Sequence, residues 1–290
     1  MDPKALILGA FHVAIAGTVF CYGLQATREG LAYLLHRPGL LGRSLLAMLV
    51  IVPIVVVVCV KSLNLPHAAA VVLTALSISP IPPMLPKKQL KGGGMAPYGL
   101  GLLLVLGLGS IVTVPLWVAL LENVFGLPLS MRPDAIVKIV LTMVVAPLLV
   151  GMLCAKLMPR LAQALLEPVR KLAGLLLIAG ALVLLAGTWR AIWSATGHWA
   201  VVSIVAFVLL GLLVGHLLGG PEQEHASVLA LSAASRHPAI ALTIASASFP
   251  DEQFAPTLAL YLIVCTVVVI PYVKWQRQRS AHVPDHIQAN

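Results

Sequence analysis

The stretch "LSAASRHPAIAL", residues 231–242, places an arginine, a histidine and a proline side by side inside an apolar segment. Arg236 carries a permanent charge, and Pro238 removes a backbone hydrogen bond from any helix that it interrupts. Of the 290 residues, 60% are hydrophobic and only 10% are charged, and the mean hydropathy is +0.99. So few charges cannot cover the surface of a soluble domain of this size. The composition therefore predicts an all-α polytopic membrane protein.

Apolar runs of about 20 residues are long enough to cross the hydrocarbon core of a bilayer as helices. Runs bounded by proline, glycine and charge predict about nine transmembrane helices. The predicted spans are 5–26, 44–63, 66–86, 96–121, 135–157, 169–188, 198–219, 225–248 and 254–275. Pro80, Pro82 and Pro83 interrupt the third span, and Pro238 interrupts the eighth. We expect both of these helices to be broken, the alternative being a pair of simple proline kinks.

The positions of lysine and arginine predict the orientation, because short cytoplasmic loops are enriched in both. With the N-terminus outside, thirteen of these residues fall on the inner side and five on the outer side. We therefore expect an integral protein of a bacterial inner (plasma) membrane, with its C-terminus in the cytoplasm. The same placement accounts for the formal net charge of +9. The basic residues thus indicate contact with the lipid bilayer and not with nucleic acid.

Within each of two pairs of predicted spans, the third with the eighth and the fourth with the ninth, the two sequences resemble each other. "LTALSISPIPPMLPKK" (73–88) and "LALSAASRHPAIALTI" (229–244) both place two serines before a proline, and "IVTVPLW" (111–117) echoes "VVVIPYVKW" (267–275). In the predicted topology the third span runs inward and the eighth runs outward. Similar sequences of opposite orientation are typical of an inverted repeat. Broken helices at corresponding places in two halves indicate the binding site of a transporter.

The order of these features resembles the bile acid:sodium symporter family. The similar features are "GLQ" (23–25), the linker "LLHRP" (34–38), Pro53 within a span, the break after Ser79-Pro80, and "ALSAASRHPAIALTIA" (230–245). The resemblance extends over nearly the whole chain. It implies a divergent, bacterial-type member with nine helices, in which inverted repeats form a panel domain and a core domain.

By this resemblance, spans one, five and six form the panel, and spans two to four and seven to nine form the core, where two broken helices cross. The resemblance implies a single membrane transporter domain over 1–290. Its first repeat, 5–122, is one helix short, its second is 135–275, and 276–290 is a cytoplasmic tail. The expected function is secondary active transport of a small organic anion, by alternating access in which the core moves against the panel.

At the position of that family's sodium site, the sequence departs from the family pattern. Sodium-coupled members carry a pattern like E-x-G-x-Q-N at the second crossing helix, whereas Ala233, Ser235, His237 and Pro238 stand at the matching positions. No Asp or Glu lies within the core of any predicted span. A hard cation prefers oxygen ligands and usually some negative charge. We therefore expect no metal site and no cofactor; a sodium ion held by hydroxyl and carbonyl oxygens is the alternative.

Arg236 admits three interpretations, since a charge at the bilayer centre costs roughly 3 kcal/mol or more and needs a partner. It stands in for sodium as a fixed cation, pairs with an anionic substrate, or serves as a structural arginine on carbonyl oxygens. His237 could accept a proton during transport. Lys87 and Lys88 mark the cytoplasmic side or turn toward the site. The predicted substrate-binding residues are Arg236, His237, Ser232, Ser235, Ser77, Ser79, Lys87, Lys88 and Thr243.

Three other functions compete with a sodium-independent carrier. A sodium-coupled, bile-acid-like symporter is the nearest of them. A channel or a receptor that does not transport is the second. An intramembrane enzyme is the third, although the chain has no HExxH, no GxSxG and no pair of membrane carboxylates. We expect the protein not to be an enzyme.

Overall fold

The computed structural model describes residues 3–26, 30, 32–126, 138, 141–195 and 198–281, and these contain helices and no strands. Each predicted span coincides with one helix or with a run of adjoining helices. In chain order these are α1 (Pro3–Gln25); α3 (Pro38–Leu45), the π-helical turn η1 (Leu46–Ile51) and α4 (Val52–Ser62); α5 (His67–Ile78) and α6 (Leu85–Lys91); α7 (Ala96–Phe125); the π-helical turn η2 (Leu141–Val145) and α9 (Ala146–Leu157); α10 (Pro159–Ala195); α11 (His198–Leu218); α12 (Gln223–Ala234) and α13 (Pro238–Ser248); and α14 (Ala255–Ala281).

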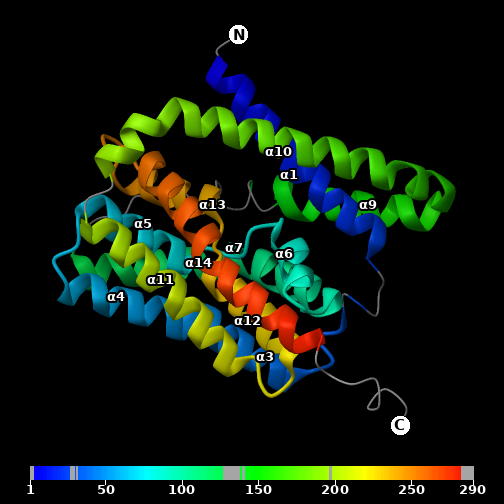
Figure 1. The fold of residues 1–290 in the computed structure, drawn as a ribbon, viewed down its shortest axis with the longest axis horizontal. Coiled ribbons are helices and arrows are strands. Elements are labelled where there is room, and N and C mark those ends of the chain that lie inside the picture. Colours follow the sequence, from blue (N-terminus) through cyan, green and yellow to red (C-terminus); the bar gives the residue numbers. More distant parts are fainter. Residues whose placement is uncertain are drawn as a thin grey trace.

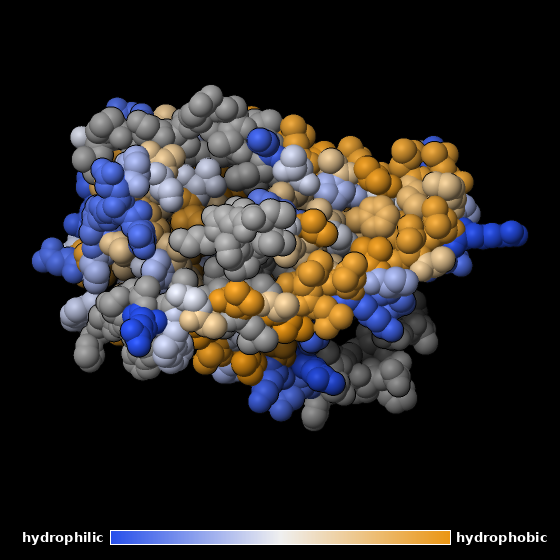
Figure 2. All heavy atoms as spheres, turned by 90° about the horizontal axis from the view of Figure 1, so that it is seen from above, coloured by the Kyte–Doolittle hydropathy of each residue, from blue (hydrophilic) through white to orange (hydrophobic). Residues whose placement is uncertain are grey.

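The predicted all-α membrane fold is confirmed. Five helical segments in the described ranges are long and apolar enough to cross a bilayer, and two shorter apolar helices, His67–Ile78 and Leu141–Leu157, accompany them. Figure 2 shows apolar side chains over the central and right-hand parts of one face, with hydrophilic side chains at its left and right ends and along its lower edge. The chain is an integral membrane protein. The start of the predicted second repeat at 135 and most of the tail at 276–290 lie outside the described residues.

The helices form two layers (Figure 1). In one layer α1 packs against both α9 and α10, and we call these three helices the panel. The remaining helices, α3 to α7 and α11 to α14, pack mainly with one another, and we call them the core. Along the chain, α1 is followed by three core spans, and α9 and α10 are followed by three more. The predicted repeats would produce this order, and their relation by symmetry stays a prediction.

Both predicted helix breaks are present and follow from proline chemistry. After Ile78 the chain carries Pro80, Pro82 and Pro83, which donate no backbone hydrogen bond, so helical structure resumes only at Leu85. The eighth span stops at Ala234 and resumes at Pro238. Proline suits this first helical position, because the backbone N–H that it lacks has no partner there in any helix.

Small residues bring α11 and α12 into backbone contact. Gly215 faces Ala230 so closely that a β-carbon at 215 would overlap the Ala230 backbone. Gly211 and Gly219, one turn to either side, meet the backbone of Ala233 and Ala226 in the same way. Close approach of this kind is how helices gain van der Waals contact where lipid provides no hydrophobic driving force. The contact fixes α12, and with it the second break, to the body of the core.

We predict that Gly215→Ala destabilises the protein by about 1–3 kcal/mol, the usual penalty for overpacking. Thermal unfolding in detergent measures the effect. The matched control is Gly109→Ala in α7, where an added methyl meets nothing within 4 Å. That variant keeps or slightly raises the midpoint, because alanine is the better helix former. Equal midpoints for the two variants would contradict the packing described for α11 and α12.

Candidate functional site

The two breaks touch each other. The backbone N–H of His237, in the second break, donates to the carbonyl oxygen of Pro80, in the first, at 2.8 Å. Ser235 and His237 both have extended backbone, so the peptide groups between α12 and α13 point sideways instead of along a helix. Residues that lie 157 positions apart in the sequence thereby meet at one crossing in the middle of the core.

Arg236 fills that crossing. Its side chain is 1% exposed and donates to three carbonyl oxygens. Nε donates to Ala233 at 3.2 Å and Nη1 to Ser79 at 3.1 Å. Nη2 donates to Met48, in the π-helical turn η1, at 3.1 Å. The guanidinium therefore joins the break of α12 and α13, the break after α5, and the second span. Of the three interpretations, the geometry favours a fixed cation held by carbonyl oxygens.

Prolines explain why two of those oxygens are available. In a regular helix the oxygen of Ser79 would accept from residue 83, which is Pro83 and has no N–H. In η1 the N–H of Val52 donates to Ala47, and a π-helical bond to Met48 would have to come from Pro53. Both oxygens thus lack a backbone donor inside a bilayer, where such a group must find one within the protein. Arg236 supplies it.

Helix α14 stabilises the same crossing through residues that the sequence did not single out. Pro238 leaves Ala234 without its helical donor, and the Tyr261 hydroxyl donates to this oxygen at 3.2 Å. The same hydroxyl accepts from the backbone N–H of Arg236 at 2.7 Å. The Cys265 thiol lies 3.6 Å from both Ala234 O and the Ser235 hydroxyl. A tyrosine in an apolar span gives no sequence signal of such a role.

His237 caps α13 instead of facing an open site. Its Nδ1 accepts from the backbone N–H of Ile240 at 3.4 Å, so the hydrogen of the neutral ring lies on Nε2. The side chain is 2% exposed, and among the described residues nothing accepts a hydrogen bond from Nε2. Protonation at Nδ1 would break the cap beside the buried charge of Arg236. The geometry thus gives no support to proton uptake by His237.

The predicted serines and Thr243 mostly bond the preceding helical turn. Ser77 donates to Thr74 O, Ser79 to Ala75 O, Ser232 to Val228 O and Thr243 to Ala239 O, at 2.7 to 2.9 Å. The four serines among the predicted site residues are buried, whereas Thr243 is part-exposed on α13. Ser79 and Ser235 lie at the crossing. Ser77, Ser232 and Thr243 lie along the helices that lead away from it.

Gln89, which sequence reasoning missed, joins α6 and α12, one half of each broken helix. Its side-chain amide on α6 donates to the Ser232 hydroxyl at 2.8 Å and to Val228 O, on α12, at 3.3 Å. Ser227 adds a bond from α12 to Gly92 O at 2.6 Å. Gln89 is 1% exposed, and glycine at position 99 leaves the space that its amide fills. The half-helices α6 and α12 therefore belong to one rigid unit.

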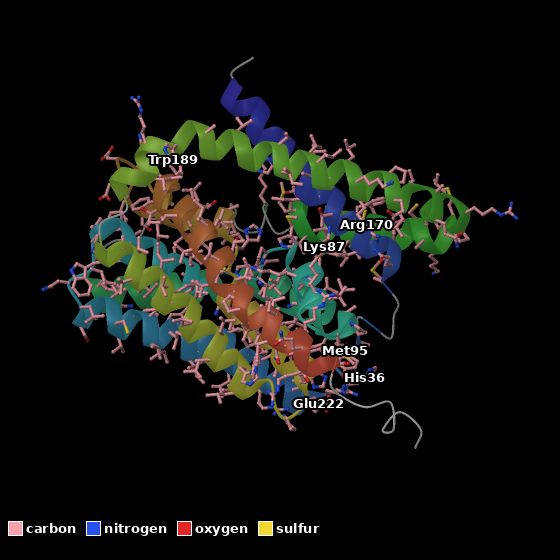
Figure 3. The ribbon with its side chains drawn as sticks, viewed as in Figure 1. His36, Lys87, Met95, Arg170, Trp189 and Glu222 are labelled. Atoms are coloured by element: carbon pink, nitrogen blue, oxygen red, sulfur yellow. The ribbon has the colours of Figure 1, made fainter. Side chains whose placement is uncertain are left out.

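A cavity of about 460 Å³ separates this unit from the panel. Its core wall comes from α6, α7 and the segment just before α6, and includes Lys87; its panel wall comes from α1 and α10, and includes Arg170 (Figure 3). Arg170 is paired with Glu167 at 2.6 Å. Lys87 is exposed, and no acidic group in the described part of the chain pairs with it. Lys88, one position on, does not line the cavity.

A second pocket, of about 190 Å³, lies beside α5 and α13, the halves of the two broken helices other than α6 and α12. Its walls come from α4, α5, α7, α13 and Phe249, and are almost wholly apolar. The polar side chains there are His67, Thr74 and Ser248, and His67 is paired with Glu252 at 3.2 Å. Among the described residues, no lysine or arginine lines this pocket. The cavity beside Lys87 is therefore the better candidate for an anion.

The Sodium Bile acid symporter family, as described by its sequence model, matches residues 13–194. The match spans well over half of the 290 residues and takes in the panel and the first break. It ends before the second break, so Arg236 lies beyond it. No curated protein matches the chain.

We predict that Arg236→Met lowers the free energy of unfolding by about 3 kcal/mol or more. Three buried carbonyl oxygens lose a donor, and each loss costs about 1–3 kcal/mol. Arg236→Lys restores the charge but not the planar fork that reaches three acceptors, so we expect it to recover only part of the loss. Thermal or denaturant unfolding in detergent measures both variants. A loss no larger than that of Thr243→Val, a change on the part-exposed side of α13, would show that Arg236 does not hold the crossing together.

Proposed function

The chain belongs to the sodium bile acid symporter family, and we propose that it carries a small organic anion across the membrane without a coupling sodium ion. The observation that carries the proposal is the guanidinium of Arg236, bonded to carbonyl oxygens of three core segments. Family membership makes the protein a transporter. The absence of sodium coupling and the organic anion are our inferences from the crossing and the cavity.

A sodium ion at the crossing would compete with a charge that is already there. Sodium needs several oxygen ligands and usually a carboxylate to balance it. The carbonyl oxygens that the broken helices could offer to a sodium ion accept hydrogen bonds from Arg236 instead. The positive charge of Arg236 would also repel a sodium ion. Among the residues that the structure describes, no Asp or Glu is buried. We infer that Arg236 performs permanently the structural task that a bound cation performs in sodium-coupled members, which is to hold the two breaks together.

Proton coupling through His237 is not part of this proposal. A proton on Nδ1 would remove the cap of α13 and place a second positive charge next to Arg236 inside the core. His237 instead keeps the second break in shape. The carrier that follows from these two residues binds its anion with no co-transported cation.

The anion is best accommodated between the panel and the core. The cavity volume of about 460 Å³ lies within the range of roughly 300–1,000 Å³ that is usual for small-molecule sites. Lys87 offers an unpaired ammonium group on the core wall, and Gln25 and Thr18 add polar groups on the panel wall. Apolar side chains, among them Leu90 and Leu100, complete the lining. This lining suits an acid group attached to a hydrocarbon body.

Alternating access follows from the position of the cavity between two bodies. Lys87 belongs to the core, whereas Gln25 and Thr18 belong to the panel, so movement of one body against the other opens or closes the cavity. Gln89 and Ser227 tie α6 to α12, so Lys87 moves together with the crossing. Binding and movement are thereby linked through the core.

The test is a thermal-shift measurement on the purified protein with benzoate, p-toluenesulfonate and taurocholate, each in sodium chloride and in potassium chloride. We expect at least one anion to raise the midpoint by the same amount in both salts. Lys87→Gln should weaken the apparent affinity for that anion about tenfold or more, since it removes a charge-assisted hydrogen bond. Lys88→Gln is the matched control, one residue away and outside the cavity lining, and should keep the affinity.

Uptake of the same anion into proteoliposomes, again with and without sodium, separates transport from binding. Equal rates in the two salts support the proposal. Stabilisation or uptake that requires sodium would overturn it and would establish a sodium-coupled symporter. Flux far above carrier turnover would establish a channel, and conversion of the anion would establish an enzyme.

A further inference from the structure

Among the residues that the structure describes, no charged neighbour cancels the charge of Arg236. Its hydrogen-bond partners are carbonyl oxygens, and the group that contacts its backbone is the Tyr261 hydroxyl. Among the lysines, arginines, aspartates and glutamates in the described part of the chain, Arg236 alone is buried. An arginine side chain stays protonated in a protein. The interior of the core therefore carries one net positive charge.

This charge is fixed to the core and has no bond to the panel. Its partners lie in or beside α12, α5 and η1, and Tyr261 lies in α14, all of which are core elements. A cation taken from solution can leave after the core has moved, so an empty core of that kind can return without it. Arg236 cannot leave. Whenever the core moves against the panel, the positive charge moves with it.

We infer that the unloaded core of this carrier moves a positive charge through part of the membrane potential, so that voltage drives transport and a negative cell interior drives export of the anion. The inference rests on the proposed transport of an anion without sodium. It adds a driving force and a direction, which the proposed function leaves open.

The charge balance of one cycle gives the direction. An anion bound beside Lys87, which also belongs to the core, removes one positive charge from the loaded core, so its movement depends less on voltage than that of the empty core. The empty core keeps its full positive charge, and a negative interior favours its inward-facing position, where it loads anion from inside. One cycle of export moves one negative charge outward. A potential of about 100 mV can then hold the external anion concentration roughly fifty-fold above the internal one.

The decisive measurement needs no substrate. Voltage steps applied to patches of giant proteoliposomes should give transient charge movements in the anion-free wild-type protein. The expected charge saturates at large voltages and amounts to a fraction of one elementary charge per molecule, because the core crosses part of the field. Saturating anion from the set above should reduce the transient, since it offsets one positive charge of the core.

Two variants test whether the moving charge belongs to Arg236. Arg236→Gln should reduce the transient by the charge that Arg236 carries, and Arg236→Lys, which keeps the charge, should retain it. Arg160→Gln removes an exposed cation from α10 of the panel and should leave the transient unchanged. If the variants at position 236 do not fold, the wild-type protein alone still tests the inference. A core that carries an uncancelled charge must give a transient charge movement.

The outcomes separate this inference from the proposed function. Anion uptake by a wild-type protein that shows no substrate-free charge movement would overturn the inference and leave sodium-independent transport standing. An unchanged transient in folded Arg236→Gln would also overturn it. A transient that Arg236→Gln reduces, in a protein that takes up none of the three anions, would support the moving charge and contradict the proposed function.

Discussion

The structure of the core depends on how three carbonyl oxygens find hydrogen-bond donors in a place without water. Broken helices leave such oxygens exposed, and inside a bilayer each must be satisfied by the protein itself. Arg236 satisfies the oxygens of Ala233, Ser79 and Met48 with one planar group. A permanent charge is tolerated at the centre of the molecule because it meets a concentration of negative dipole ends. Neither the charge nor the breaks would be stable without the other.

Prolines account for several carbonyl oxygens that need a side-chain donor in the core. Pro83 and Pro238 each remove the backbone donor that a helical carbonyl four residues earlier would have used, at Ser79 and Ala234. Arg236 and Tyr261 donate to these two oxygens at 3.1 and 3.2 Å. Beside Pro53, the neighbouring oxygens of Met48 and Leu49 accept from Arg236 and Trp117 at 3.1 and 2.9 Å. Prolines in the core thus act together with polar side chains that are distant in the sequence, and the pairs lock the helices in place.

The sequence alone was sufficient for the helices and their breaks, because apolar runs and prolines act locally. It also yielded the fixed-cation interpretation of Arg236, since a buried charge must find oxygen atoms. It did not identify Gln89, Tyr261 or Met48, because their roles arise from the rotation of one helix against another. The same limit applies to Lys87 and Lys88, adjacent residues of which only the first lines the cavity. Which of the two lysines faces the cavity depends on how α6 is rotated about its own axis. This helix is too short for sequence periodicity to predict that rotation.

A fixed cation and a bound cation solve the same structural problem with different consequences for energy. A bound sodium ion holds the breaks together and also brings the energy of its gradient. In the carrier that we propose, Arg236 holds them together in every step and brings no gradient with it. Removing Arg236 from that carrier would leave an alanine at position 233, which supplies no carboxylate for a sodium ion. The remaining carbonyl oxygens were exposed by the prolines in an arrangement that suits a planar fork of N–H groups. The two solutions are therefore separated by several coordinated changes, and the crossing of this chain is built throughout for the guanidinium.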